Sequence, residues 1–303
     1  SELALQLRAI MDGLTAPGAL LEPPSPERGG VTYPVLKMAP ESLPAFFDRF
    51  CAQHGDAEFL VEGDLRLTFT QVHALARRVA WGLVSRHDVR KGDRVGIAAR
   101  NSVNWVVAWM GVLMAGGVAS LLNGWWTGEE LADGVRLVDC PLVLADPARA
   151  ARLEGQDHPA RVLVFDHGDP ETGLALLLGE ETPLSAVTGD DLATILYTSG
   201  STGAAKGAFS DHRGVIHGAL SYAAQSLMVL TWFTKFGTPP AGQQSALVNV
   251  PLFHVTGEVP VLLQSFVIGR KLVIMSKWDA LEAVRLIEAE RIAYFVGVPL
   301  MSW

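Results

Sequence analysis

Cysteine is scarce in this sequence. Only Cys51 and Cys140 occur among its 303 residues, and neither lies in a CxxC pair or beside a cluster of cysteine and histidine. This excludes a disulfide framework and a structural zinc site of the usual spacing. We therefore expect a reducing, cytoplasmic setting and assign no metal ligand to the chain.

Charged residues are also few, and acidic ones prevail. They make up 18% of the chain, against 49% hydrophobic residues, where an average soluble protein is roughly a quarter charged. The sequence can therefore fill a large buried core, and disorder is not expected. Lys and Arg number 24 against 32 Asp and Glu, a net charge of −8, which disfavours nucleic acid and anionic membranes as partners.

One uncharged run needs a separate explanation. Residues 105–122 (WVVAWMGVLMAGGVASLL) carry no charge and reach the lower length limit of a membrane span. The Gly116–Gly117 pair and the lack of a flanking Lys/Arg cluster favour a buried helix followed by a buried strand. Within residues 1–14, three charged residues interrupt any signal-peptide core, so this stretch is interpreted as an amphipathic helix.

The patterning divides the chain into three segments. Residues 1–41 are expected to be an extended N-terminal lead-in, because Pro and Gly are frequent after the first helix. Residues 42–189 and, after a polar connector, residues 190–303 each alternate strand and helix patterns. This alternation of strands and helices predicts an α/β fold of two packed lobes of mostly parallel sheet flanked by helices. Because the sequence stops just after a strand pattern, we expect the second lobe to be truncated.

The expected elements follow from the apolar spacing, as where Leu75, Val79 and Leu83 fall on one helical face. Strands are expected near residues 58–61, 65–69, 94–99, 117–122, 141–145, 161–165, 192–197, 246–250, 271–275 and 293–297. Helices are expected near residues 42–53, 70–86, 103–114, 128–138, 147–153, 212–230, 256–266 and 279–290.

The most informative segment is residues 195–207, ILYTSGSTGAAKG, in which a strand pattern leads into small and hydroxylated residues and then a lysine. Glycines allow successive N–H groups to turn toward one anion, and the hydroxyls and the lysine add donors and positive charge. Composition alone leaves a flexible Ser/Gly surface loop as the alternative. We predict a polyphosphate site made by Thr198, Ser199, Gly200, Ser201, Thr202, Gly203 and Lys206.

Three familiar site motifs are missing. Lys206 precedes a glycine and not Ser or Thr, so the loop is not a P-loop, and no G-x-G-x-x-G follows a strand pattern. A G-x-S-x-G nucleophile elbow is also missing, which disfavours a serine hydrolase. His254, in PLFHVTG, is a further candidate, although a histidine after an apolar strand is by itself more often structural.

The segment YTSGSTGAAKG at residues 197–207 resembles the signature loop of the adenylate-forming superfamily of acyl-CoA synthetases, firefly luciferase and peptide-synthetase adenylation domains. Three more stretches agree in order and rough spacing, and the resemblance covers nearly everything from residue 42 onward. The family usually has proline where this sequence has Ala205, which is expected to alter loop mobility. The three stretches are LTFTQVHALARRVAWGL at 67–83, RVGIAARNSVNWVVAWMGVLMAGGVASLLNGWWTGEEL at 94–131 and NVPLFHVTG at 249–257.

The resemblance implies an AMP-forming acid–thiol ligase. In the family a carboxylate attacks the α-phosphate of Mg-ATP, and coenzyme A then displaces AMP from the acyl-adenylate. ATP, Mg²⁺ and coenzyme A are the implied cofactors, with the loop and Lys206 holding phosphates. His254 would lie at the entrance of the acid pocket and Phe253 would line it. The segment WWTGEEL at residues 125–131 resembles the same segment of bacterial fatty-acyl ligases. This likeness favours a fatty or other hydrophobic acid as the substrate.

Some alternatives stay open. The family's later motifs, which include its magnesium-binding acid and the lysine of its mobile C-terminal domain, do not occur in the sequence and are expected beyond Trp303. The fragment by itself is therefore expected to be inactive. A catalytically incomplete nucleotide-binding homologue and an adenylation domain for another acid class remain alternatives, and a homodimer stays open.

Overall fold

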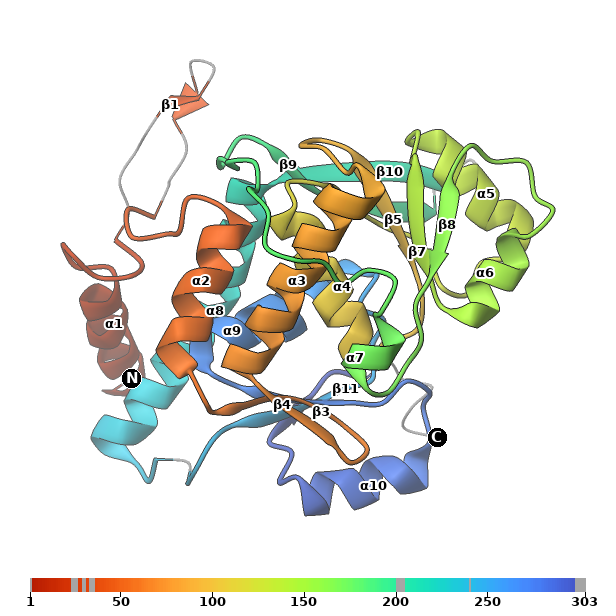
Figure 1. Cartoon of the computed structure of the whole chain (residues 1–303). Helices are drawn as coiled ribbons and strands as arrows, with labels where there is room; N and C mark the ends of the chain where they lie inside the picture. Colours follow the sequence, from red (N-terminus) through yellow and green to blue (C-terminus); the bar gives the residue numbers. More distant parts are fainter. Residues whose placement is uncertain are drawn as a thin grey trace.

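The computed structural model describes residues 2–22, 27–28, 31–32, 36–199, 205–239 and 241–297. Within these residues the strands form a six-stranded sheet, a five-stranded sheet and a short hairpin of β1 (Glu27–Arg28) and β2 (Val31–Thr32) (Figure 1). Helices cover the faces of both large sheets. The expected α/β fold class is therefore confirmed.

The first sheet has the strand order β10-β9-β6-β5-β7-β8. Neighbouring strands are parallel except for β9 and β10. Every residue of β6 and β7 is buried, as expected of parallel strands covered on both faces. The strands are β5 (Arg94–Ala98), β6 (Val118–Leu121), β7 (Leu142–Ala145), β8 (Arg161–Val164), β9 (Leu192–Ser199) and β10 (Ala205–Asp211).

The second sheet, in the order β13-β11-β12-β3-β4, combines strands from both halves of the chain. Only β3 and β4 pair antiparallel within it. Because β3 and β4 precede residue 189 and the other strands follow it, the proposed border between residues 189 and 190 does not separate the two sheets. The strands are β3 (Glu58–Glu62), β4 (Leu65–Thr68), β11 (Ser245–Val248), β12 (Lys271–Ile274) and β13 (Tyr294–Phe295).

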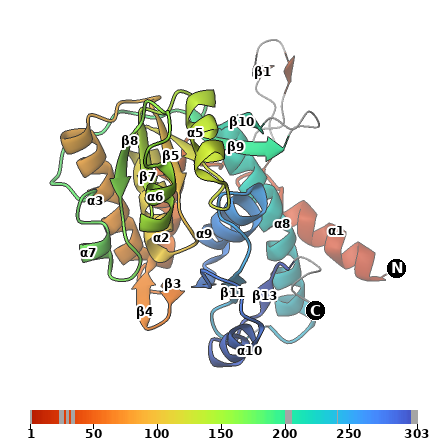
Figure 2. The same cartoon turned by 90° about the vertical axis from the view of Figure 1, so that its right-hand side faces the viewer.

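The helices form a layer between the sheets and cover their outer faces. Figures 1 and 2 show α2, α3, α4, α8 and α9 between the two sheets, with α5 and α6 outside the first sheet and α10 outside the second. The helices are α2 (Leu43–His54), α3 (Phe69–His87), α4 (Val103–Met114), α5 (Gly128–Leu137), α6 (Pro147–Leu153), α7 (Pro170–Gly173), α8 (His212–Phe236), α9 (Gln264–Ile268) and α10 (Ala280–Ala289).

The N-terminal lead-in is not extended throughout. Its first part is α1 (Glu2–Leu14), the expected amphipathic helix, which lies along α8. Trp232 Nε1 donates a hydrogen bond to Gln6 Oε1 at 2.9 Å, and Ile10 is buried. A helix forms here because its apolar face finds a partner on α8.

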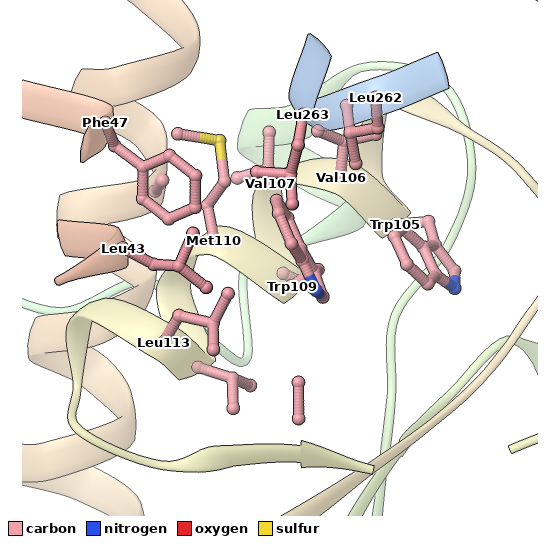
Figure 3. Close-up of a cluster of buried hydrophobic side chains, with 14 of the residues drawn as sticks. Leu43, Phe47, Trp105, Val106, Val107, Trp109, Met110, Leu113, Leu262 and Leu263 are labelled. Atoms are coloured by element: carbon pink, nitrogen blue, oxygen red, sulfur yellow. The ribbon is translucent and has the colours of Figure 1, made fainter. Parts of the chain in front are cut away.

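The uncharged run at residues 105–122 lies in the protein core, as expected. All twelve residues of α4 are buried, and Figure 3 shows their side chains packed against residues of α2 and of the segment around Leu262. The rings of Phe47 and Trp109 meet edge to face with centroids 5.4 Å apart. Between α4 and β6, Gly116 adopts a φ of +83°, which a residue with a side chain rarely does.

Hydropathy leaves a membrane span as the alternative for the same run. Among the helices of the described residues, none combines the length and the apolar character that crossing a membrane requires. The run contains the last ten residues of α4 and all four residues of β6, so the glycine pair separates two elements.

Several elements differ from the sequence-based expectation, and two of them adjoin the predicted phosphate loop and His254. No strand was expected over residues 205–211, yet β10 pairs antiparallel with β9 there. β10 is an edge strand, and an edge strand can form without a run of apolar residues. The helix expected over residues 256–266 is a π-helix, Gly257–Leu263, followed by α9. Pro260 lies inside the π-helix and has no N–H for a regular helical hydrogen bond.

Candidate functional site

The candidate site lies where several strands of both sheets end. Thr198 is at the carboxyl end of β9, Asn123 follows β6, and His254 follows β11. All three line one cavity of about 820 Å³. Ligands of open α/β sheets bind at the carboxyl ends of strands, so this cavity has the position expected of a binding site.

The predicted phosphate loop connects β9 to β10. Ser199 pairs with Ala205 at the loop end of this hairpin, and Thr198 pairs with Lys206. Gly200, Ser201, Thr202 and Gly203 lie outside the described residues, as does the side chain of Ser199. The residues that carry the loop therefore stand at the edge of the cavity, which Thr198 and Ala205 line.

Lys206 projects from the same hairpin. As cross-strand partners, Thr198 and Lys206 point to the same side of the ribbon. The lysine is exposed, and within the described parts of the chain no ion pair is formed by its ammonium group. It is not among the residues that line the cavity. Lys206 is thus a cation beside the loop, outside the cavity wall, with no ion-pair partner among the described residues.

Tyr197 anchors the base of the hairpin. Ser120 Oγ on β6 lies 2.7 Å from Tyr197 Oη, which donates a hydrogen bond to the carbonyl of Gly134 on α5 at 2.8 Å. The ring also meets Trp126 edge to face at 5.2 Å. Burial raises the pKa of Tyr197 above its ordinary value, so the phenol stays protonated and acts as a structural link.

His254 is exposed and lines the cavity. The main-chain N–H of Thr256 donates to Nδ1 at 3.3 Å. An imidazole nitrogen that accepts a hydrogen bond carries no proton, so in the neutral ring the proton is on Nε2. Nε2–H is therefore the donor available to a ligand.

Asn101 holds the segment that carries His254. Its Nδ2 donates to the carbonyl of Val250 at 2.7 Å, and its Oδ1 accepts from the N–H of Leu252 at 2.9 Å. Asn101 follows β5 of the first sheet, whereas Val250 and Leu252 follow β11 of the second. One buried amide thus joins the ends of the two sheets next to the candidate site.

Gly257 closes the turn after His254. A Cβ atom at this position would lie 2.2 Å from the carbonyl oxygen of Pro251, much closer than van der Waals contact. The N–H groups of Gly257 and Glu258 both donate to the carbonyl of His254, at 2.9 and 3.0 Å. Only glycine lets the chain turn back this tightly beside the histidine.

Phe253 lines a second, smaller cavity next to the first. Its ring meets that of Trp125 edge to face at 5.3 Å, and both residues border a space of about 170 Å³. The wall also contains Arg149, whose Nε donates to the carbonyl of Gly124 at 2.8 Å. The exposed Trp125, to which no role was assigned from the sequence, thus forms an aromatic surface together with Phe253.

Asp146 and Arg149 form a buried ion pair beneath this surface, 3.0 Å apart. Burial alone raises the pKa of Asp146, but hydrogen bonds from His167 and from the N–H groups of Arg100 and Arg149 lower the pKa to about 2. The carboxylate is therefore ionised throughout the neutral range, and the pair holds the segment of Gly124 in place.

The wall of the larger cavity formed by α5 carries both signs of charge. Glu130, Asp133 and Arg136 line it, and Arg136 pairs with Asp133 one helical turn away. Glu130 accepts hydrogen bonds from Thr127 in a capping box at the start of α5. Among the described residues no group of three or more His, Cys, Asp or Glu side chains is arranged to hold a metal ion.

The structure therefore brings together Thr198 and His254, which are separated by 55 intervening residues, and places Phe253 in the adjoining cavity. Sequence reasoning missed Asn101, Tyr197 and Arg149 as positioning residues. Asn101 and Tyr197 lie within stretches that carry the resemblance, but nothing local to them shows which backbone groups they contact.

Comparisons with known proteins identify the family of the chain. The family described as AMP-binding enzyme matches residues 47–302. The chain is 29% identical over 283 residues to 3-[(3aS,4S,7aS)-7a-methyl-1,5-dioxo-octahydro-1H-inden-4-yl]propanoyl:CoA ligase of Rhodococcus jostii (86% of this chain, 52% of the relative). It is 30% identical over 243 residues to 4-coumarate–CoA ligase-like 3 of Oryza sativa subsp. japonica (74% and 40%). The chain thus spans about half the length of the curated relatives it matches.

Solved structures give the same result for the fold. The N-terminal domain of FACL13 from Mycobacterium tuberculosis superimposes with a TM-score of 0.70 at 25% identity, covering 86% of this chain and 64% of that one. O-succinylbenzoate coenzyme A synthetase from Bacillus subtilis, in complex with ATP and magnesium ion, gives 0.69 at 22% identity, covering 85% and 64%, and so supports the fold alone. With a family match that extends over most of its length, the chain belongs to the AMP-binding enzyme family.

Proposed function

We propose that this chain is the N-terminal part of an AMP-forming acid–thiol ligase that activates a hydrophobic carboxylic acid with ATP and transfers it to coenzyme A. One observation carries the proposal: in a chain of the AMP-binding enzyme family, the base of the Ser/Thr/Gly loop and His254 line the same cavity of about 820 Å³. A cytoplasmic location belongs to the proposal and is supported by two free, buried cysteines.

The loop and Lys206 are proposed to bind the β- and γ-phosphates of ATP. Lys206 is exposed beside the loop, and it forms no ion pair with any described residue. At about 4 Å from a phosphate oxygen and an effective dielectric near 20, one such charge contributes on the order of 4 kcal/mol before desolvation. Mg²⁺ would enter with the ATP phosphates as part of the substrate, since the described residues offer no metal cluster.

His254 and Phe253 are proposed to contact the carboxylic acid substrate. With Nδ1 engaged by the N–H of Thr256, Nε2–H is free to donate to an anionic oxygen where the carboxylate approaches ATP. Phe253 and Trp125 supply an apolar surface next to it. Catalysis then rests on orienting the two anions and on neutralising their charge, and no protein nucleophile takes part.

We propose a fatty acid as the substrate, with a bulky ring-containing or aromatic acid as the alternative. The likeness to the structure named fatty acyl CoA synthetase from Mycobacterium tuberculosis supports the first. Relatives named for 4-coumarate and for an indene-based propanoate support the second. A panel of octanoate, palmitate, 4-coumarate and benzoate separates these classes by which acid is activated.

The test is acid-dependent exchange of labelled pyrophosphate into ATP by the full-length protein. Exchange with at least one acid of the panel is the expected result, and Lys206→Ala should lower the rate by about tenfold or more, since a charged hydrogen bond is removed. Lys235→Ala, at the exposed end of α8, is the matched control and should leave the rate unchanged.

Two outcomes contradict the proposal. Exchange with none of the acids of the panel would contradict the proposed substrate class and favour a nucleotide-binding homologue that has lost catalysis. Equal rates for Lys206→Ala and for the wild type would mean that the phosphates bind elsewhere.

A further inference from the structure

A third cavity lies between α8 and the amino-terminal end of the second sheet, and it shares no lining residue with the two cavities of the candidate site. It has a volume of about 320 Å³ and is lined by Ser245, the first residue of β11, by Arg270, just before β12, and by Ala293, just before β13. His254 follows the opposite end of β11. The cavity is therefore at the amino ends of parallel strands whose carboxyl ends face the candidate site.

Arg270 is the unusual feature of this cavity. Its side chain is 3% exposed, and its Nη1 is buried without a hydrogen-bond partner among the described residues. Its guanidinium carbon lies 4.7 Å from the centre of the Tyr294 ring, and no described carboxylate pairs with it. Burial lowers the pKa of Arg270 only to about 10, so the group is charged at neutral pH. An uncompensated buried charge is costly.

The residues around Arg270 favour one class of ligand. Among the described residues that line the cavity, Arg270 is the only charged one, and Val229, Leu230 and Ile268 form an apolar wall. Gln244 also lines the cavity and lies beside Arg270, because its carbonyl accepts the N–H of Lys271 at 2.8 Å. The space thus offers one guanidinium, two carboxamides (Gln225 and Gln244), uncharged hydroxyl side chains and apolar surface.

We propose that this cavity binds a small carboxylic acid with an apolar body, whose carboxylate pairs with Arg270. A guanidinium can donate two parallel hydrogen bonds to one carboxylate, and the apolar wall accepts the remainder of the molecule. A single cation suits a monoanion better than a polyphosphate. The site is separate from the proposed ligase centre, and its occupation needs neither ATP nor coenzyme A.

Calorimetric titration of the 303-residue chain with benzoate tests the proposal, with benzamide as the uncharged probe of the same shape and inorganic phosphate as the anion without an apolar body. Benzoate should bind, and benzamide and phosphate should bind at least about tenfold more weakly, because each loses either the charged hydrogen bonds or the apolar contact. Arg270→Met should weaken benzoate binding by at least the same factor. Arg285→Met, on the exposed face of α10, should bind benzoate as the wild type does.

A second variant keeps the test decisive if Arg270→Met does not fold. Gln244→Glu places a carboxylate beside the guanidinium, so it should abolish benzoate binding and raise the melting temperature of the ligand-free chain. The proposal is overturned if benzoate does not bind at millimolar concentration, if phosphate binds as tightly as benzoate, or if both variants retain wild-type affinity. Because no nucleotide is present, a negative result would leave the proposed ligase function untouched.

Discussion

At the scale of single residues, the site depends on residues that position the main chain around His254. Asn101 uses both ends of its amide to hold the backbone on either side of Pro251, and Gly257 allows the close turn after His254. The imidazole itself is exposed. Its direction is therefore set by neighbours that secure the main chain.

Asn101→Ala should destabilise the protein by about 2 to 4 kcal/mol, because it leaves the carbonyl of Val250 and the N–H of Leu252 buried without partners. Chemical denaturation measures this change. The exposed amide Gln156 serves as the control, since Gln156→Ala should have little effect. Equal stability of the Asn101 variant and the control would show that the amide does not hold the two sheets together.

Glu258 should make stability depend on pH. The carboxyl is fully buried; Oε1 accepts from Trp109 Nε1 at 3.3 Å, and Oε2 has no partner among the described residues. Burial raises the pKa of Glu258 from 4.5 to about 7. Below pH 4.5 both the folded and the unfolded state are protonated. Between pH 4.5 and 7 the unfolded state loses its proton first, so stability falls as the pH rises.

The loss should total on the order of 3 kcal/mol by pH 8, at about 1.4 kcal/mol per pH unit between the two pKa values. Urea unfolding at pH 5, 6, 7 and 8 measures it. Glu258→Gln, which cannot ionise, should lack this decline. His212, whose pKa burial lowers to about 4, titrates alike in both proteins and cancels. Parallel profiles for the two proteins would refute the assignment.

At the scale of elements, the hairpin of β9 and β10 is the unit that presents the loop. One of its strands is in the sheet interior, paired with β6, and the other is at the edge. Tyr197 joins this unit to β6 and to α5. The loop is thus attached at a rigid base while the edge strand remains open on one side.

Tyr197→Phe should loosen that base. The change removes only the hydroxyl and leaves the Gly134 carbonyl and Ser120 Oγ without their shared partner, so a loss of about 1 to 2 kcal/mol is expected. Hydrogen exchange should speed up in β9 and α5 more than in β3 or β12. Tyr222→Phe, a partly exposed position on α8, is the control, and matching exchange rates for the two variants would contradict the anchoring role.

At the scale of the whole molecule, the two halves of the chain are joined by exchanged strands. β3 and β4 of the first half complete the second sheet, and β9 and β10 of the second half complete the first sheet. One large hydrophobic cluster contains residues of both halves, among them Phe47, Trp109, Leu262 and Phe266. Neither half can bury its apolar surface alone.

Fragments 1–189 and 190–303 should therefore fail to fold separately and should associate when produced together. Circular dichroism of each fragment and co-purification of a tagged pair measure this. The intact chain should unfold in one cooperative transition, as expected when a single core spans both halves. Cooperative unfolding of either fragment alone would instead support the predicted domain border between residues 189 and 190.

The sequence by itself determined most elements and the class of fold. The buried helix of residues 103–114 and the parallel strands of the first sheet follow from local periodicity, because apolar spacing reflects which face of an element is covered. The Ser/Thr/Gly loop and His254 were recognisable because their neighbours in the sequence form motifs.

Only the tertiary structure decided which elements share a sheet and which residues share a cavity. The exchange of β3 and β4, the pairing of β10, the amide link of Asn101 and the unpaired charge of Arg270 all depend on contacts between residues far apart in the chain. Such contacts are selected by the packing of whole elements. The identity of a single residue does not show which distant residue it will contact in the folded chain.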